Sequence, residues 1–67
     1  MTMKRYWFAL MDADYNDLGV SIPDGSSKQT AVNCAKRLMR EIGIQSAQLQ
    51  VNSMITDNLL EFIEIEL

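Results

Sequence analysis

The strongest constraint on the fold of this chain is one helical pattern near its middle, flanked on both sides by strand patterns. Projected at about 100° per residue, the apolar side chains of residues 31–42 fall on one broad stripe. These are Ala31, Val32, Cys34, Ala35, Leu38, Met39 and Ile42. Ser26 and Gln29 have the spacing of a capping box, and Gly43 suits the left-handed position that ends a helix. The pattern predicts an amphipathic helix with one buried face.

Segments with strand patterns lie on both sides of this helix. Residues 4–11 are apolar on both faces, and residues 19–22 form a short second segment after a turn-rich stretch. Residues 46–52 alternate between apolar and polar side chains. In the last segment, residues 59–67, Ile63, Ile65 and Leu67 face one way and Glu64 and Glu66 the other. Phe62 has the parity of the neighbouring glutamates, so either it faces outward with them or a β-bulge shifts the register beside it.

The order of these segments predicts a small two-layer α+β domain with the arrangement ββαββ. One amphipathic helix packs on a mainly antiparallel sheet of about four strands, and residues 1–67 form a single domain. A chain this short buries only about 60% of the surface that it exposes when unfolded, so stability is expected to be marginal. The single cysteine, Cys34, excludes an internal disulfide and is expected to be buried as a small hydrophobe. Oligomerisation remains as a way to bury more surface.

A single helix leaves the other face of the sheet without a covering layer. Strand parity places a mixed set of side chains there, namely Trp7, Ala9, Met11, Gln48, Gln50, Phe62, Glu64 and Glu66. Because residues 4–11 are apolar on both faces, the opposite assignment of that strand stays open. Aromatic residues ringed by polar groups are typical of protein interfaces. Trp7, Met11 and Phe62 are therefore the predicted partner-binding residues, unless loops or termini cover them.

A basic face on the helix offers an alternative site. Lys36, Arg37 and Arg40 lie opposite the apolar stripe, and Lys28 is a further candidate member. Such residues would neutralise nucleic-acid phosphates and give an affinity that depends steeply on salt. However, the chain has a net charge of −3, and its aromatic residues do not lie among these cations. A solvated helix face is the simpler interpretation, and a nucleic-acid-associated regulator is the alternative function.

One stretch resembles a known family of regulators. The run VSIPDGSSKQTAVNCAKRLMREIG, residues 20–43, together with the strand before it, resembles the HicB type of antitoxin. In that family a hairpin with an acidic turn ends in a Pro-Asp step and leads into an amphipathic helix. The Pro-Gly-Cys-like signature that usually follows this step is absent here, so no residue receives a role from the resemblance. What the resemblance implies is an antitoxin-like small regulator.

Two short motifs resemble ligand sites but depart from them at required positions. A P-loop needs Gly-x-x-x-x-Gly-Lys-Ser/Thr, whereas Gly25 alone precedes Lys28 here, so no phosphate cradle is expected. The loop from Asp12 to Gly19 begins like an EF-hand calcium loop, but Asp17 and Pro23 occupy the positions of the required Gly and Glu. Side chains that bond their own backbone are the simpler interpretation. We expect neither a metal nor a cofactor.

Groups that carry catalysis are scarce in this chain. It has no histidine to act as a general base or to activate Cys34, and Glu64 and Glu66 alternate as solubilising strand residues do. We therefore do not expect an enzyme. The apolar stretch at residues 6–11 is too short for a signal peptide or a membrane span, so a cytoplasmic protein without membrane contact is expected. The sequence predicts a small protein-protein interaction module that forms a homodimer or docks on another protein.

Overall fold

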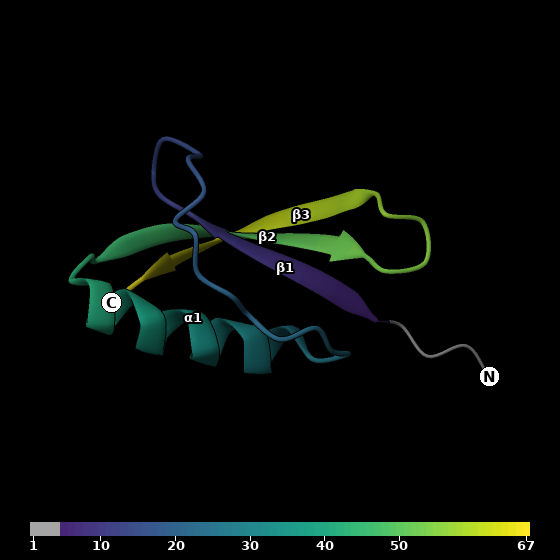
Figure 1. Cartoon of the computed structure of the whole chain (residues 1–67), viewed down its shortest axis with the longest axis horizontal. Coiled ribbons are helices and arrows are strands. Elements are labelled where there is room, and N and C mark those ends of the chain that lie inside the picture. The colour runs from purple at the N-terminus through teal and green to yellow at the C-terminus, as the bar shows by residue number, and fades with distance from the viewer. Residues whose placement is uncertain (1–4) are drawn as a thin grey trace.

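A computed structural model describes residues 5–67 of the chain. It shows one helix packed on one face of a three-stranded antiparallel sheet (Figure 1). Strand β1 spans Tyr6–Met11, helix α1 spans Lys28–Ile42, strand β2 spans Ser46–Ser53 and strand β3 spans Leu59–Glu66. Strand β2 is central, with β1 on one side and β3 on the other. The predicted α+β class and the packing of a single helix on an antiparallel sheet are confirmed.

The predicted second strand at residues 19–22 does not form, so the sheet has three strands and not about four. Two short contacts hold the segment beside β1. The Leu18 N–H donates to the Leu10 carbonyl at 3.1 Å, and Tyr6 and Gly25 exchange hydrogen bonds of 2.7 and 3.1 Å. The segment from Leu18 to Gly25 has more residues than the stretch of β1 between Tyr6 and Leu10, beside which it runs. It therefore bows away from the edge of the sheet, and its middle cannot pair.

The alternation that suggested a strand in this segment reflects burial on one side only. Ile22 is buried, Leu18 and Val20 are half-buried against the same core, and the residues between them are exposed. A period of two in burial thus arises here without the hydrogen bonds of a ladder. Lys4, where the first strand was predicted to begin, lies outside the described residues.

A β-bulge at Leu60 sets the register of β3. Val51 lies opposite Glu61, whereas the next residue of β2 lies opposite Leu59, so Leu60 has no partner on β2. Beyond the bulge, Phe62 shares the sheet face of the even-numbered glutamates. Both features considered for Phe62 from its parity are therefore present, an outward orientation and a bulge close to it.

The hydrophobic core lies between α1 and the sheet. Its buried apolar residues are Phe8, Leu10, Ile22, Ala31, Ala35, Met39, Ala47, Leu49, Val51 and Ile65. Two alanines on the inner face of α1 let the helix approach the sheet closely, and Leu49 fills the centre of β2 with no exposed surface. The face of β1 that carries Phe8 and Leu10 contacts the helix, which confirms the predicted parity of this strand.

The helix begins one residue later than its capping-box pattern predicts. Ser27 is the N-cap, and its hydroxyl accepts a hydrogen bond from the Thr30 N–H at 3.2 Å. The side chain of Gln29 does not reach back, because it donates to Asn33 Oδ1 at 3.0 Å. Ser27 has extended backbone angles, with φ −113° and ψ 114°, so the first helical turn follows it and not Ser26.

The C-terminus of the helix is as predicted. Gly43 adopts a left-handed conformation with φ 90°, and both its N–H and that of Ile44 donate to the Met39 carbonyl, at 2.8 and 3.0 Å. The helical pattern predicts that Ile42 lies on the buried stripe. In the structure its side chain is 45% exposed, because the last turn of the helix extends past the core.

We expect Ser27→Ala to lower the free energy of unfolding by about 1 kcal/mol, since it removes the hydroxyl that accepts the Thr30 N–H. Ser26→Ala is the matched control and should change stability by less than about 0.5 kcal/mol. Urea unfolding followed by circular dichroism measures both. A larger loss in Ser26→Ala than in Ser27→Ala would contradict the N-cap described here.

Candidate functional site

The face of the sheet that turns away from α1, here called the open face, carries side chains from all the strands. They are Trp7, Ala9 and Met11 of β1, Gln48, Gln50 and Asn52 of β2, and Phe62, Glu64 and Glu66 of β3. Residues paired across strands lie side by side on one face, so Ala9, Gln50 and Phe62 form one row across the sheet. The structure therefore places the three predicted partner-binding residues, Trp7, Met11 and Phe62, on one surface.

Trp7 is half-buried at one end of the open face and is held in place by polar contacts. Its indole Nε1–H donates to Asp57 Oδ1, in the turn between β2 and β3, at 2.8 Å. Asn52, beside Trp7 in the ladder, is only 3% exposed, and its amide donates to the Trp7 carbonyl at 3.4 Å. The turn thus fixes the ring of Trp7. The sequence did not single out Asp57 or Asn52, because their contacts cross a distance of many residues.

Phe62 is 39% exposed and contacts an aromatic ring from a distant loop. Tyr15, in the loop after β1, meets it edge to face, with ring centroids 5.2 Å apart and an interplanar angle of 75°. Because Tyr15 follows one edge strand and Phe62 lies on the other, the loop reaches over the open face (Figure 1). A loop therefore does cover part of this face. Tyr15 was not predicted, and its one signal is an aromatic residue within an acidic loop.

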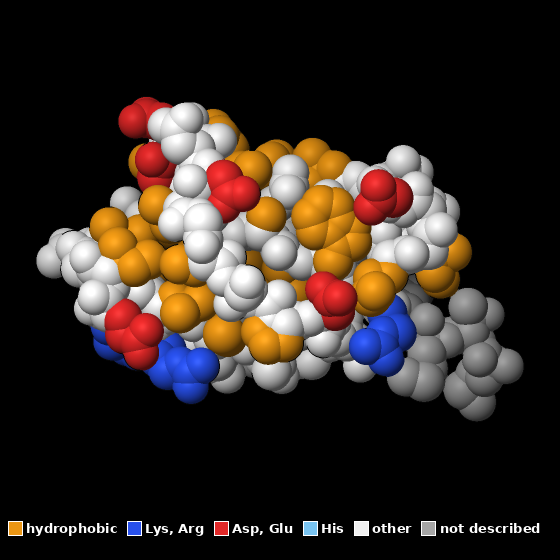
Figure 2. Space-filling model, viewed as in Figure 1, with side chains coloured by type: hydrophobic (Ala, Val, Ile, Leu, Met, Phe, Trp, Pro, Cys, Tyr) orange, Lys and Arg blue, Asp and Glu red, His pale blue; other side chains and the backbone are white. Residues whose placement is uncertain are grey.

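Exposed apolar residues continue from the open face to the β2–β3 turn. Leu59 and Leu60, at the bulge, are 48% and 51% exposed, and Met54 and Ile55 in the turn are exposed as well. Figure 2 shows hydrophobic side chains interspersed with polar ones over the visible side of the sheet. Neighbouring residues of a strand point to opposite faces of the sheet, so two consecutive leucines cannot both point into one core. Here the bulge leaves both exposed.

The acidic loop satisfies its own backbone, as predicted. Asp12 Oδ1 accepts hydrogen bonds from the N–H groups of Asp14 and Asn16 at 2.8 and 3.0 Å, and Asp17 Oδ1 accepts from the Gly19 N–H at 2.8 Å. The hydrogen bond from the Asn16 backbone is the main cause that lowers the pKa of Asp12 below its usual 3.8. Within residues 5–67, no group of three or more Asp, Glu, Cys or His side chains is placed to hold a metal ion.

The basic face of α1 is smaller than the sequence allowed. Arg37 and Arg40 are exposed and Lys36 is half-buried, and basic side chains gather over the C-terminal half of α1 at the lower left of Figure 2. Lys28 is not part of this group, because its ammonium pairs with Glu61 of β3 at 2.6 Å. That hydrogen bond raises the pKa of Lys28 above its usual 10.5. The pair ties the start of the helix to the far edge strand.

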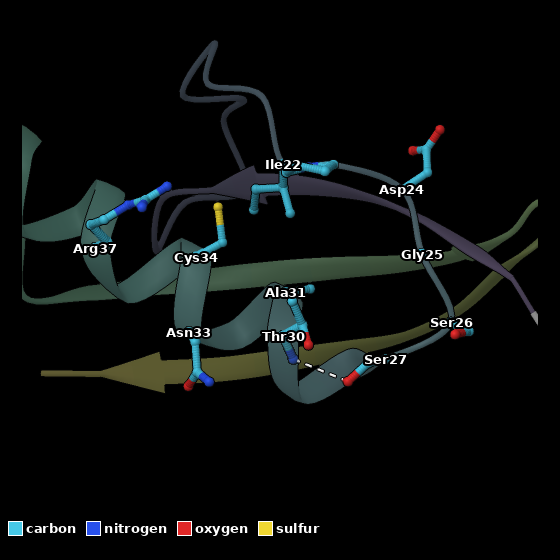
Figure 3. A pocket seen from close by; sticks show the side chains of 11 residues that line it. Ile22, Asp24, Gly25, Ser26, Ser27, Thr30, Ala31, Asn33, Cys34 and Arg37 are labelled. Carbon is cyan, nitrogen blue, oxygen red and sulfur yellow. Dashed lines mark hydrogen bonds between the residues drawn. The ribbon is translucent and has the colours of Figure 1, made fainter.

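A groove of about 560 Å³ lies between the segment at residues 22–27 and α1. Its middle is apolar, since the side chains of Cys34 and Ile22 point toward one another, while Arg37 lies at one end and Thr30 at the other (Figure 3). The position of Cys34 on the apolar stripe predicts a buried side chain, whereas in the structure this side chain is only half-buried. The lining of the groove thus joins an apolar middle to polar ends.

Comparison of the chain with protein-family models, with curated proteins and with solved structures finds no match. The resemblance to HicB antitoxins therefore has no support beyond the residues that suggested it. No helix in the described part of the chain is long and apolar enough to cross a membrane. A functional assignment has to rest on the surfaces described above. Among them, the open face brings together the predicted partner-binding residues.

We expect the Asp12 carboxyl group to titrate below 3.8, because two backbone N–H groups bond its charged form. Since the folded pKa is the lower one, its contribution to stability is complete above 3.8 and disappears as the pH falls through the folded value. Side-chain carbon NMR measures this pKa directly. A value at or above 3.8 would contradict the assigned bonds.

Proposed function

We propose that this chain is a small, non-enzymatic protein-interaction module that docks through its open face on a second copy or on another protein. The observation that carries the proposal is the contact between Tyr15 and Phe62, whose rings meet edge to face yet remain 57% and 39% exposed. Leu59, which pairs with Asn52 of the open face, adds a further exposed apolar side chain. Contiguous exposed apolar groups with a polar rim mark interaction sites on soluble domains.

The state of Trp7 adds a second argument for docking. Its ring is fixed by the hydrogen bond to Asp57, so binding would cost little further side-chain entropy there. Gln48 and Gln50 are half-buried between the aromatic positions and offer amide groups for hydrogen bonds to a partner. An apolar contact with preorganised rings and nearby amides is the composition expected at the centre of an interface.

The other parts of the proposal follow from the chemistry of the chain. A role without catalysis agrees with a sequence that has no histidine and with a Cys34 that faces Ile22 in an apolar groove. We place the protein in the cytoplasm, without a cofactor and without membrane contact.

A nucleic-acid-associated or antitoxin-like regulator is the second candidate. One observation favours it, namely that Arg37 and Arg40 are exposed on α1, away from the acidic loop. The group is small, however, and Lys28 is engaged with Glu61.

Replacing Trp7 with lysine is expected to weaken association while the fold persists, because a lysine at this position still finds Asp57 as a partner. Phe62→Lys should act in the same direction. The measurement is the solution mass by light scattering after size exclusion, at low and high salt. Self-association through apolar groups should give a mass above 7.6 kDa at both salt concentrations.

Ile42→Lys is the matched control, since Ile42 is also an exposed apolar residue but lies on the helix. It should leave the mass unchanged. If the control and the two open-face variants all have the wild-type mass and the same partner binding, the open face is not the docking surface.

For the second candidate, we expect a labelled DNA duplex or single strand to show no binding at low salt, since few cations remain free on α1. A salt-dependent affinity that disappears in the double variant Arg37→Glu, Arg40→Glu would instead favour the regulator. Arg5→Glu serves as the control, because Arg5 is exposed and lies off the helix.

A further inference from the structure

Strand β3 is an edge strand, and its hydrogen-bonding phase can be read from its last residues. The Leu67 N–H donates to the Gln45 carbonyl at 2.9 Å, so odd-numbered residues of this strand direct their backbone groups to β2. In an antiparallel ladder the two sides alternate from residue to residue. The N–H and C=O groups of Phe62, Glu64 and Glu66 therefore point away from the sheet. In the part of the chain that the structure describes, no strand lies beyond them.

The two edges of the sheet differ in how they are protected. The outer edge of β1 is engaged at both ends by the segment after it, through Tyr6 with Gly25 and Leu10 with Leu18. Strand β3 has no such cover, contains no proline and carries apolar side chains that are still exposed. A long edge of this kind is a template for pairing with another strand, unless its charges prevent it. The charges on β3 therefore decide which strand can pair there.

Self-pairing of β3 is restricted to a few registers. Outward-facing residues have to lie opposite outward-facing residues, so an even-numbered residue meets an even-numbered one. Over the regular part of β3 that follows the bulge, residues 61–66, two registers share the longest overlap, one with its two-fold axis at Glu64 and one with its axis at Ile63. About the axis at Ile63, Phe62 lies opposite Glu64 of the partner subunit, and the two Ile63 residues face each other as a close pair without hydrogen bonds.

This register sets no glutamate directly opposite another glutamate. Along the regular part of the strand its pairs are Glu61 with Ile65 of the partner subunit and Glu64 with Phe62 of the partner subunit, while Glu66 lies opposite the bulge at Leu60 of the partner subunit. Shifting the axis to Glu64 would instead place two glutamates face to face, which is destabilising. Of the two registers with the longest overlap, the charge pattern of β3 thus permits the one about Ile63.

Two further contacts support the same register. Glu61 is already paired with Lys28 at 2.6 Å, so its charge adds little repulsion at the seam. Phe62 and its copy become diagonal neighbours on the open face, at about 7–8 Å, which is within reach of aromatic rings. The diagonal approach of Glu64 to its own copy is the one repulsive contact between neighbouring residues.

We infer that β3 pairs antiparallel with β3 of a second copy, about an axis at Ile63, and so forms one continuous sheet with both helices on the same side. The inference goes beyond docking through the open face, because it uses the backbone groups of the edge and not the side chains of Trp7 and Met11. Pairing would join the two open faces into a single larger one.

Amide hydrogen exchange on the wild-type protein tests this pairing without any substitution. The amides of Phe62, Glu64 and Glu66 should exchange rapidly in dilute solution and slow by at least about tenfold when the concentration rises enough to form the dimer. The amides of Ile63 and Ile65 should be protected throughout, because they bond to β2. Equally fast exchange of the even-numbered amides at all concentrations overturns the inference.

A pair of variants at one position gives a second test. Glu64→Pro removes an outward N–H but no hydrogen bond within the subunit, so the solution mass should fall to that of the monomer. Glu64→Gln keeps the N–H and removes the diagonal repulsion, so the dissociation constant should fall a few-fold. A folded Glu64→Pro protein that dimerises like the wild type overturns the inference. If the proline prevents folding, the exchange experiment decides.

The two modes of association fail separately. Trp7→Lys should leave the protection of the even-numbered amides of β3 intact if the edge pairs. If this variant instead abolishes self-association and those amides exchange rapidly in the wild type, docking through the open face is correct and pairing of β3 is not. Protection that appears only when another protein is added also overturns pairing with a second copy.

Discussion

One helix covers one face of a narrow sheet, and the rest of the molecule depends on that contact. Ala31 and Ala35 bring α1 close to the sheet, and Met39 and Leu49 fill the space between the layers with no exposed surface. Burying a large apolar side chain such as Met39 or Leu49 contributes about 1.5–3 kcal/mol to the free energy of unfolding. In so small a domain this contact supplies much of the favourable free energy, because few other residues are fully enclosed. Residues 5–67 contain no second helix with which to cover the opposite face.

The loop after β1 and the turn between β2 and β3 each cover part of that opposite face. A loop that satisfies its own backbone carries Tyr15 over to Phe62, and a turn places Asp57 against Trp7. Both Tyr15 and Asp57 have a positive φ, 63° and 61°, which costs conformational energy outside glycine. Partial cover of the two aromatic rings thus comes with backbone strain at Tyr15 and Asp57. What stays exposed is the surface on which the proposed interactions depend.

The helix and its end at Gly43 could be predicted, because each follows from the spacing of residues close in sequence. In contrast, β1 is apolar on both faces, and its spacing did not decide which face meets the helix. The failures have a common physical origin. Residues 19–22 alternate in burial but make no ladder hydrogen bonds to β1, since the segment contacts that strand only at its two ends, through Leu18 and Gly25. The contacts of Lys28 with Glu61 and of Trp7 with Asp57 join residues far apart in the chain. Local spacing carries no information about such pairs, so the size of the basic face and the partial cover of the open face could not be predicted.

The hydrogen bond between Trp7 and Asp57 has a practical consequence for optical work on this protein. Trp7 is the only tryptophan, and it lies against the turn between β2 and β3 and not in the core under α1. Its fluorescence therefore reports the closure of that turn. Circular dichroism in the far ultraviolet reports mainly α1. Divergence between the two signals during unfolding would show the hairpin end opening before the helix leaves the sheet.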